Sequence, residues 1–332
     1  MKKRLLALCL LMALCLPCFF GCGGGEPYQA VLYNKLNTDI VITLFSAGKT
    51  KSEDELVAAC EALLDEAEDI LSRAAAEAEL ARVNANPAES VTVSDTLAEV
   101  ISLSLSLAKN TNGAFDPTAG ALADLYNITG DTPLPPTEAD VAAALATVGY
   151  HRITLTGNTL TRAPGTMLDF GAVAKGYLAA SLVAYLRGEG VSGGVLSLGG
   201  NVAVFGKKPG GNPFRVAIRS PQGGAAGLLE LTGEAYVSTS GAYERYRIGA
   251  DGKRYHHIFD PATGRPAESG LASVTVVDEN GARADALSTA LYVMGWDAAI
   301  AYWETQGKDF DMLLISESGD MYATPGMNFK TL

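Results

Sequence analysis

The spacing of apolar residues along the chain predicts a mixture of helices and strands. Over residues 53–80, apolar side chains recur three and four positions apart with acidic residues between them, which predicts an amphipathic helix. Its apolar stripe includes Cys60, so this thiol is expected to be a buried small side chain. Further helices are predicted over residues 96–109, 138–147, 173–187, 283–294 and 297–305.

Runs rich in β-branched and aromatic residues predict strands, most of them in the second half of the chain. These runs cover residues 39–45, 153–155, 195–205, 214–218, 228–237, 271–277 and 312–315. Three prolines place a loop over residues 132–137. Because the strands come in groups, without the regular strand–helix–strand spacing of a parallel sheet, the pattern predicts an α+β fold.

The first residues have the layout of an export signal. Basic residues at positions 2–4 precede an apolar run over 5–20, which is too short to span a membrane stably. The run ends at Gly21 and Cys22 before three glycines, as at a bacterial lipoprotein cleavage site. We predict a signal peptide over residues 1–21, lipidation of Cys22, a flexible tether over 22–29 and a folded domain over 30–332. Cleavage at Cys18 or Cys15, or an ordinary signal peptide, are the alternatives. The anchor would hold the domain on the outer face of the cytoplasmic membrane or in the periplasm.

Composition narrows the classes of partner. Four of the five cysteines lie in the predicted leader, so the exported domain has no disulfide framework and must be stabilised by its core. The formal net charge is −12, and it becomes −15 once the three basic residues of the leader are removed. Nucleic acid is not expected as a partner, because a phosphate backbone needs clustered Lys and Arg. A phosphorylated ligand would need a metal or a few placed cations.

Two segments near the end of the chain carry candidate chemistry. His257 is the best candidate for proton transfer, although a structural, hydrogen-bonded histidine would have the same sequence pattern. If this segment ends a strand, His256 should point the opposite way. Asp285 and Thr289 are four residues apart in a predicted helix, so their oxygens share one face, as Mg²⁺ ligands would. Capping of the helix start would also explain Asp285.

Glycine-containing segments could approach an anion. Asp169 and Gly171 precede the predicted helix 173–187, whose free amides and dipole favour a phosphate, and Lys175 could reach the same anion. A capped helix with a solvated lysine is the alternative. The pair Gly199 and Gly200, inside a strand pattern, indicates a bulge or a close approach by a ligand or backbone.

Taken together and in order, six motifs resemble those of the ApbE family, the FAD:protein FMN transferases. They are GAFDPTAG (113–120), LDFGAVAKGY (168–177), LSLGGN (196–201), STSGAYERY (238–246), RYHHIFDPATGRP (254–266) and ADALSTALYVMG (284–295). The resemblance spans roughly residues 30–325 and implies mixed sheets with flanking helices, related to the T-fold. It also implies an enzyme that uses Mg²⁺ to move the FMN half of FAD onto a Thr or Ser of a partner protein, with release of AMP.

The resemblance implies roles for individual residues. Asp285 and Thr289 match the Mg²⁺ ligands, joined by the backbone carbonyl of Ala172, and His257 matches the histidine that assists catalysis together with Asp285. The positions that match FAD contacts are Leu36, Gly113, Ala114, Phe115, Asp116, Asp169, Lys175 and His257. Two positions depart from the family pattern: Leu36 replaces a common methionine, and Asn201 replaces a common aspartate.

Two other functions fit the same residues. In a Mg²⁺-dependent FAD pyrophosphatase, water would replace the acceptor hydroxyl and give FMN and AMP. A non-catalytic FAD-binding lipoprotein is disfavoured, because a pure binder has no need of Lys175, His257 and the Asp285–Thr289 pair together. The resemblance implies acceptors such as subunits of Rnf- or Nqr-type electron-transfer complexes. These complexes lie in the membrane, so a membrane anchor on this protein would bring it close to them.

Overall fold

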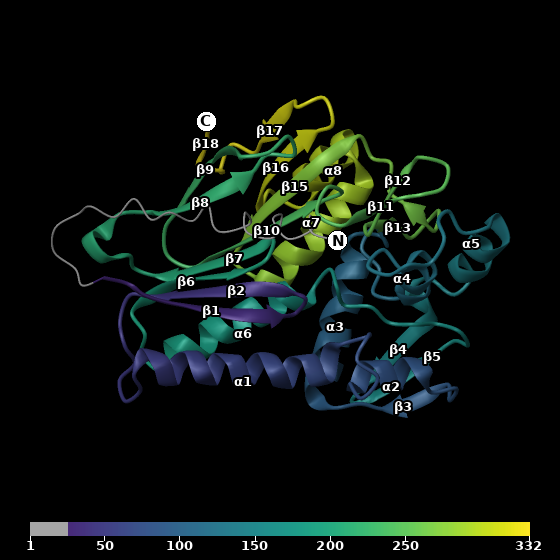
Figure 1. The fold of residues 1–332 in the computed structure, drawn as a ribbon, viewed down its shortest axis with the longest axis horizontal. Coiled ribbons are helices and arrows are strands. Elements are labelled where there is room, and N and C mark those ends of the chain that lie inside the picture. Colours follow the sequence, from purple (N-terminus) through teal and green to yellow (C-terminus); the bar gives the residue numbers. More distant parts are fainter. Residues whose placement is uncertain (1–25) are drawn as a thin grey trace, which may run out of the picture.

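An eight-stranded antiparallel sheet lies at the centre of the molecule in the computed structural model, which describes residues 26–332 (Figure 1). Its strands are ordered β1-β2-β6-β7-β10-β15-β16-β17. They cover Tyr28–Lys35 (β1), Thr38–Leu44 (β2), Gly193–Leu198 (β6), Asn201–Gly206 (β7), Ala235–Gly241 (β10), Leu271–Asp278 (β15), Asp311–Ser316 (β16) and Met321–Ala323 (β17). Helices flank this sheet, so the predicted α+β class is confirmed.

Four helices contribute to the core on one face of the sheet. They are α1 (Glu53–Leu71), α6 (Ala174–Gly188), α7 (Gly281–Met294) and α8 (Trp296–Thr305). α1 starts after Ser52, which forms a capping box with Glu55, and its apolar stripe lies in this core. Cys60 has no exposed surface there, and burial raises the pKa of its thiol to about 12. The prediction of a buried Cys60 is therefore confirmed.

The opposite face of the central sheet packs against a three-stranded sheet. This sheet contains β8 (Phe214–Arg219), β9 (Ala225–Leu231) and β18 (Phe329–Thr331), in the order β18-β9-β8. Val204 and Ile315 belong to the core between the two sheets, whereas their neighbours Phe205 and Leu314 belong to the helical core. Successive side chains of a strand point to opposite faces, so the middle strands of the central sheet are buried on both sides.

A second lobe lies beside one end of the central sheet (Figure 1). It contains α2 (Glu79–Ala85), α3 (Asp95–Asn110) and a sheet of β3 (Ser90–Thr92), β5 (Thr159–Arg162) and β4 (Ile153–Thr156). The remaining elements are α4 (Gly120–Tyr126), α5 (Glu138–Leu145), the 3₁₀ turns η1 (Tyr150–Arg152) and η2 (Pro209–Gly211), and the hairpins β11 (Tyr246–Ile248) with β12 (Arg254–His256) and β13 (Phe259–Asp260) with β14 (Arg265–Pro266).

Helix α7 joins the two lobes. Ala282, Ala286 and Ala290 pack into the core of the second lobe. Leu287 and Leu291 pack into the helical core under the central sheet. Since α7 is buried on both sides, its polar side chains are held at the junction of the two lobes.

Three predicted boundaries are wrong. The helix predicted over 53–80 ends at Leu71, because Ser72 is extended and its hydroxyl accepts a hydrogen bond from the Ala75 amide. The strand predicted over 195–205 is a β6–β7 hairpin, in which Leu198 pairs with Asn201. Gly199 and Gly200 form its turn, so they are not a bulge, but a Cβ on Gly200 would lie 3.0 Å from the Thr239 carbonyl oxygen, which confirms the predicted close approach by backbone. The strand predicted over 228–237 is likewise the end of β9 and the start of β10.

The N-terminal predictions largely fall outside the part of the chain that the structure describes. The predicted signal peptide and Cys22 lie before residue 26. Of the predicted tether, Tyr28 and Gln29 belong to β1. Within residues 26–332, no helix has the length and apolar content that crossing a membrane requires.

Candidate functional site

The candidate site is built on a close crossing of α6 and α7. A Cβ atom added to Gly176 would lie 2.0 Å from the Gly281 carbonyl oxygen, so the two helices meet backbone to backbone. This contact places Asp285 beside the first turn of α6, where its Oδ2 accepts a hydrogen bond from the Gly176 amide (2.9 Å). Val173, the N-cap residue of α6, forms no side-chain cap, so Asp285 takes that place for the first turn of α6. The Ala174 amide donates to the Phe170 carbonyl (2.8 Å) and the Tyr177 amide to the Val173 carbonyl (3.0 Å), so α6 would attract an anion mainly through its dipole.

The Asp285 carboxylate is buried without a cationic partner. It is only 4% exposed, and no ion pair within residues 26–332 involves it. Its other oxygen, Oδ1, lies 3.0 Å from the Ser238 hydroxyl of β10. Burying a carboxylate is costly unless hydrogen bonds and a positive charge compensate it. The Gly176 amide and the Ser238 hydroxyl supply the hydrogen bonds, and a bound cation would supply the positive charge.

Ser238 also connects Asp285 to Asn201. Its hydroxyl lies 2.8 Å from the Asn201 side-chain oxygen, while Asn201 Nδ2 is buried without a partner. Ser238 has only one proton and cannot donate to both neighbours. Both contacts of Ser238 can form when the amide is turned, so that Asn201 Nδ2 donates to Ser238 and Ser238 donates to Asp285; the buried atom without a partner is then the Asn201 oxygen. Asn201, whose role the sequence left in doubt, thus supports the orientation of the carboxylate.

Thr289 continues the polar face of α7 toward solvent. It is half-buried, and its hydroxyl lies 3.0 Å from the Ser240 hydroxyl of β10. Ala172 lies in the turn that precedes α6, four residues before Gly176. Asp285 thus lies at the α6–α7 crossing, Thr289 one turn further along α7, and Ala172 in the turn that leads into α6.

This set of donors fits Mg²⁺. No group of three or more His, Cys, Asp or Glu side chains able to hold a metal is present in the described chain. One carboxylate with a hydroxyl and a carbonyl supplies only hard oxygens. Mg²⁺ is commonly held by one or two carboxylates and takes its other ligands from water and substrate phosphates.

His257 lies at the end of the β11–β12 hairpin with one side open to solvent. Its Nδ1 is 3.1 Å from the Arg245 carbonyl oxygen. Because a carbonyl only accepts, Nδ1 carries the proton and Nε2 keeps a free lone pair. Protein atoms surround the rest of the ring, and this desolvation lowers the pKa of His257 to about 4. The nearby positive charges of Arg245 and Lys175 act in the same direction, which places Lys175 near the imidazole.

His256 points the opposite way, as predicted. It is buried, its Nε2 lies 3.2 Å from the Ala267 carbonyl oxygen, and its ring packs edge-on against Tyr292. It is a structural histidine.

Leu36 is held in a strained turn that reaches the same region. Leu36 and Asn37 join β1 to β2 with φ values of +53° and +56°, and a leucine in this left-handed region costs about 1 kcal/mol. The Leu36 amide donates to Glu68 (2.6 Å), and the Asn37 carbonyl accepts from Arg245 (3.5 Å). Arg245 therefore links this turn to His257.

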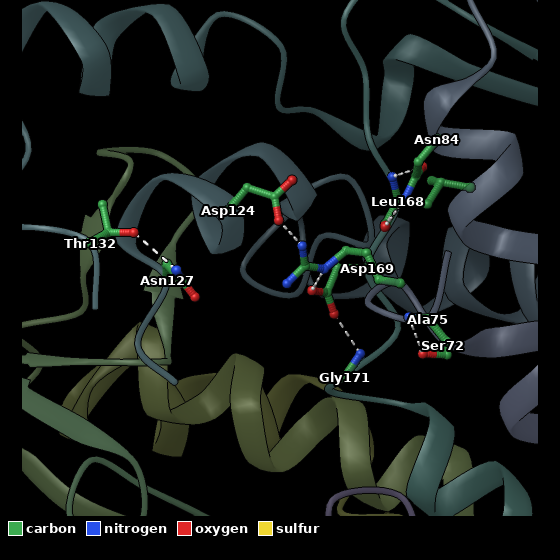
Figure 2. Close-up of polar contacts among 10 residues, drawn as sticks. Ser72, Ala75, Asn84, Asp124, Asn127, Thr132, Leu168, Asp169 and Gly171 are labelled. Carbon is green, nitrogen blue, oxygen red and sulfur yellow. Dashed lines mark hydrogen bonds and ion pairs between the residues drawn. The ribbon is translucent and has the colours of Figure 1, made fainter. Parts of the chain in front are cut away.

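Asp169 is fixed by an ion-pair network that also includes Asp124 (Figure 2). Arg73 Nε donates to Asp169 Oδ2 (2.8 Å), and the same guanidinium pairs with Asp124 of α4. The other Asp169 oxygen accepts from the Gly171 amide (2.7 Å). Asp169 thus shapes the loop that leads into α6, and Lys175 Nζ donates back to the Gly171 carbonyl (3.3 Å).

The side chains of the predicted 113–116 segment are mostly committed to the fold. Phe115 is buried in the core of the second lobe. Asp116 is buried, which raises its pKa, and it accepts from the Thr118 amide and hydroxyl and from the Tyr150 amide. Gly113 and Ala114 are half-buried. A ligand could therefore contact this segment mainly through the backbone atoms of Gly113 and Ala114.

Sequence reasoning missed the serines of β10 and the glycines of the helix crossing. Ser238 and Ser240 alternate along a strand and so share one face, a signal that could have been read from the STSG motif. Nothing local indicated that this face meets α7.

Comparisons with known proteins agree on one family. The ApbE family profile matches residues 36–314. FAD:protein FMN transferase of Vibrio cholerae serotype O1 is 33% identical over 264 residues, which cover 77% of this chain and 78% of that protein. The enzyme of the same name from Treponema pallidum is 34% identical over 258 residues, covering 72% and 71%.

Solved structures give the same result. The ApbE protein of Thermotoga maritima superposes with a TM-score of 0.84 at 29% identity and covers 90% of this chain and 97% of its own. The flavinyl transferase ApbE of Pseudomonas stutzeri gives 0.80 at 30% identity, covering 90% and 94%. The chain therefore belongs to the ApbE family.

Proposed function

We propose that the protein is an FAD:protein FMN transferase that moves FMN from FAD onto a Thr or Ser hydroxyl of a partner protein and releases AMP. The observation that carries the proposal is Asp285, a buried carboxylate without a cationic partner in the described chain, hydrogen-bonded to the first turn of α6. The names of the relatives in Vibrio cholerae and Treponema pallidum support the reaction class.

Mg²⁺ would be held by Asp285, Thr289 and the Ala172 carbonyl, where it would offset the diphosphate charge and polarise the reacting phosphorus. The protein contributes the orientation of the ligands. Gly176 and Ser238 each donate to a different Asp285 oxygen, which fixes the plane of the carboxylate and leaves its other lone pairs free. Lys175 and the dipole of α6 add positive potential for the diphosphate in an otherwise acidic protein.

His257 would accept the proton of the attacking hydroxyl. The acceptor oxygen forms a bond to the FMN phosphorus, and the bond from that phosphorus to the bridging oxygen breaks. The bridging oxygen leaves with AMP, and the hydroxyl proton passes to Nε2, the free nitrogen of His257. General-base help of this kind is worth about 10²–10⁴-fold, and positioning and charge stabilisation supply the rest.

The cellular setting is part of the proposal. A lipid on Cys22 would anchor the enzyme on the outer face of the cytoplasmic membrane, near subunits of Rnf- or Nqr-type complexes as acceptors. Replacing Cys22 with serine should move the protein from the membrane fraction to the soluble fraction after cell lysis. An unchanged distribution would contradict the anchor.

The activity is tested by mixing the purified protein with FAD, Mg²⁺ and a candidate acceptor domain. Transfer predicts a mass gain of one FMN on the acceptor, in-gel flavin fluorescence, and AMP in equal amount. Free FMN without labelled acceptor would instead identify a pyrophosphatase. The Asp285→Asn variant, which keeps the side-chain shape and removes the charge, is the control for both reactions.

A further inference from the structure

The hairpin that leads into His257 carries an unusual charge. We call residues 245–254 the basic hairpin; they contain Arg245, Arg247, Lys253 and Arg254 but only one acidic residue, Asp251. The whole chain has a net charge of −12, so this segment opposes the charge of its surroundings. Such a local reversal directs a partner of opposite charge to one place on a protein surface.

The four basic side chains of the basic hairpin form no ion pair with a carboxylate of the described chain. Arg245 and Arg247 donate to the backbone carbonyls of Asn37 and Asn127. Arg254 lies over the Tyr246 ring at 4.4 Å. Many other basic residues in the described chain are paired, including Lys35, Arg219 and Arg283. The positive charge of the hairpin therefore remains available to a partner.

The basic hairpin also exposes apolar side chains. Tyr246 is 43% exposed and Ile248 60% exposed, and they alternate along β11, so they share one face. β11 pairs only with β12 in a two-stranded sheet of the described chain, so its outer edge has no strand beside it. Apolar side chains, an open strand edge and unpaired cations together are typical of a protein-binding surface.

The surface is preformed. The Ala250 amide at the tip donates to the Leu134 carbonyl (2.8 Å), which fastens the hairpin to the loop before α5. The Tyr255 hydroxyl donates to Asp251 (2.8 Å), and its ring stacks on Tyr126 of α4. A braced surface loses little conformational entropy when it binds a partner.

We propose that the basic hairpin is the docking surface for an acidic segment of the acceptor protein, adjacent to the Thr or Ser that receives FMN. This inference rests on the proposed function. The acceptor hydroxyl must reach His257, and the hairpin runs directly into His257, so an acceptor placed for reaction lies over this surface. The acidic remainder of the enzyme would repel an acidic acceptor elsewhere and so favour this approach.

Binding can be measured without catalysis. Two dye-labelled peptides share a central threonine between glycines and differ in their flanks, which are aspartates in one and lysines in the other. Fluorescence anisotropy at low salt should show tighter binding of the acidic peptide to the wild type. Lys253→Glu should weaken that binding about fivefold to tenfold, and added salt should reduce the difference. Ile248→Ser should weaken binding at all salt concentrations.

Lys207→Glu is the matched control, because Lys207 is an exposed lysine in the β7–β8 connection, outside the hairpin. It should leave peptide binding unchanged, and FAD affinity should be unchanged in all variants. Equal binding of the two peptides to the wild type, or an equal loss in Lys207→Glu, would overturn the proposal. Transfer of FMN to an acceptor domain is measured separately. A failure of transfer with charge-selective binding intact would count against the proposed function and leave the docking surface standing.

Discussion

Replacing Gly176 with alanine should damage the enzyme far more than one methyl group suggests. The new Cβ would lie 2.0 Å from the Gly281 carbonyl oxygen, 2.6 Å from its carbonyl carbon and 2.7 Å from Asp285 Cβ. None of these atoms can swing away by a rotamer change, because two are backbone and the third is fixed to the backbone of α7. The helices must therefore separate.

The size of the effect follows from the distances. A Cβ contact needs at least 3.0 Å, so α6 and α7 must move apart by about 1 Å at this point. Overpacking of this kind costs roughly 1–3 kcal/mol of stability. The same movement would lengthen the 2.9 Å hydrogen bond between the Gly176 amide and Asp285 beyond hydrogen-bonding range. A displacement of about 1 Å in a catalytic group can cost on the order of 10²-fold in rate.

Gly188→Ala is the matched control on the same helix. A Cβ at Gly188 meets nothing within 4 Å, so this variant should be neutral or stabilised by about 0.5–1 kcal/mol. Thermal unfolding and the rate of FMN transfer are measured for both variants. Wild-type melting temperature and rate in Gly176→Ala would refute the account of the helix crossing, as would equal damage in Gly188→Ala.

The remaining predictions concern three side chains. His257→Gln should slow FMN transfer about 10²–10⁴-fold. The wild-type transfer rate should be level above pH 6 and fall as the pH approaches the His257 pKa of about 4. A fall in rate that begins near pH 7 would contradict this. The same lowered pKa affects stability. Between pH 6.5, the ordinary pKa of histidine, and about pH 4, the His257 ring is protonated in the unfolded chain but not in the folded protein. Stability should therefore decrease as pH falls from 6.5 toward 4, and less so in His257→Gln when followed by urea unfolding. Cys60 should resist maleimide labelling until the protein is unfolded, because its thiol is buried and its pKa is about 12; rapid labelling of the native protein would contradict this. Arg162→Met should lower the free energy of unfolding by about 2–4 kcal/mol, because the buried guanidinium donates to the carbonyls of Val83, Asn86 and Thr166. Urea unfolding measures this change, and a loss below about 0.5 kcal/mol would contradict the prediction.

The sequence predicted the helices wherever local signals and tertiary contacts agree. Apolar spacing placed α1, and α7 and α8 begin and end within two residues of their predicted bounds. The end of α1 was missed because residues 73–76 are good helix formers. There Arg73 is drawn to Asp169 and Asp124, which lie far away in the sequence. Long-range ion pairs of this kind outweigh local propensity and leave no mark on the local pattern.

The candidate site shows the same limit. The four-residue spacing of Asp285 and Thr289 was enough to predict a shared helical face, and alternation in the 255–257 segment separated His257 from the buried His256. The support of Asp285 by Gly176 and Ser238 was not predictable, because it depends on how α6 and β10 pack against α7.

The most direct test of the account is Mg²⁺ binding at Asp285, measured by titration calorimetry on the protein saturated with FAD. We expect one Mg²⁺ per wild-type chain, and loss of that binding in Asp285→Asn with FAD still bound and the melting temperature close to that of the wild type. Equal Mg²⁺ binding by the two proteins would contradict it.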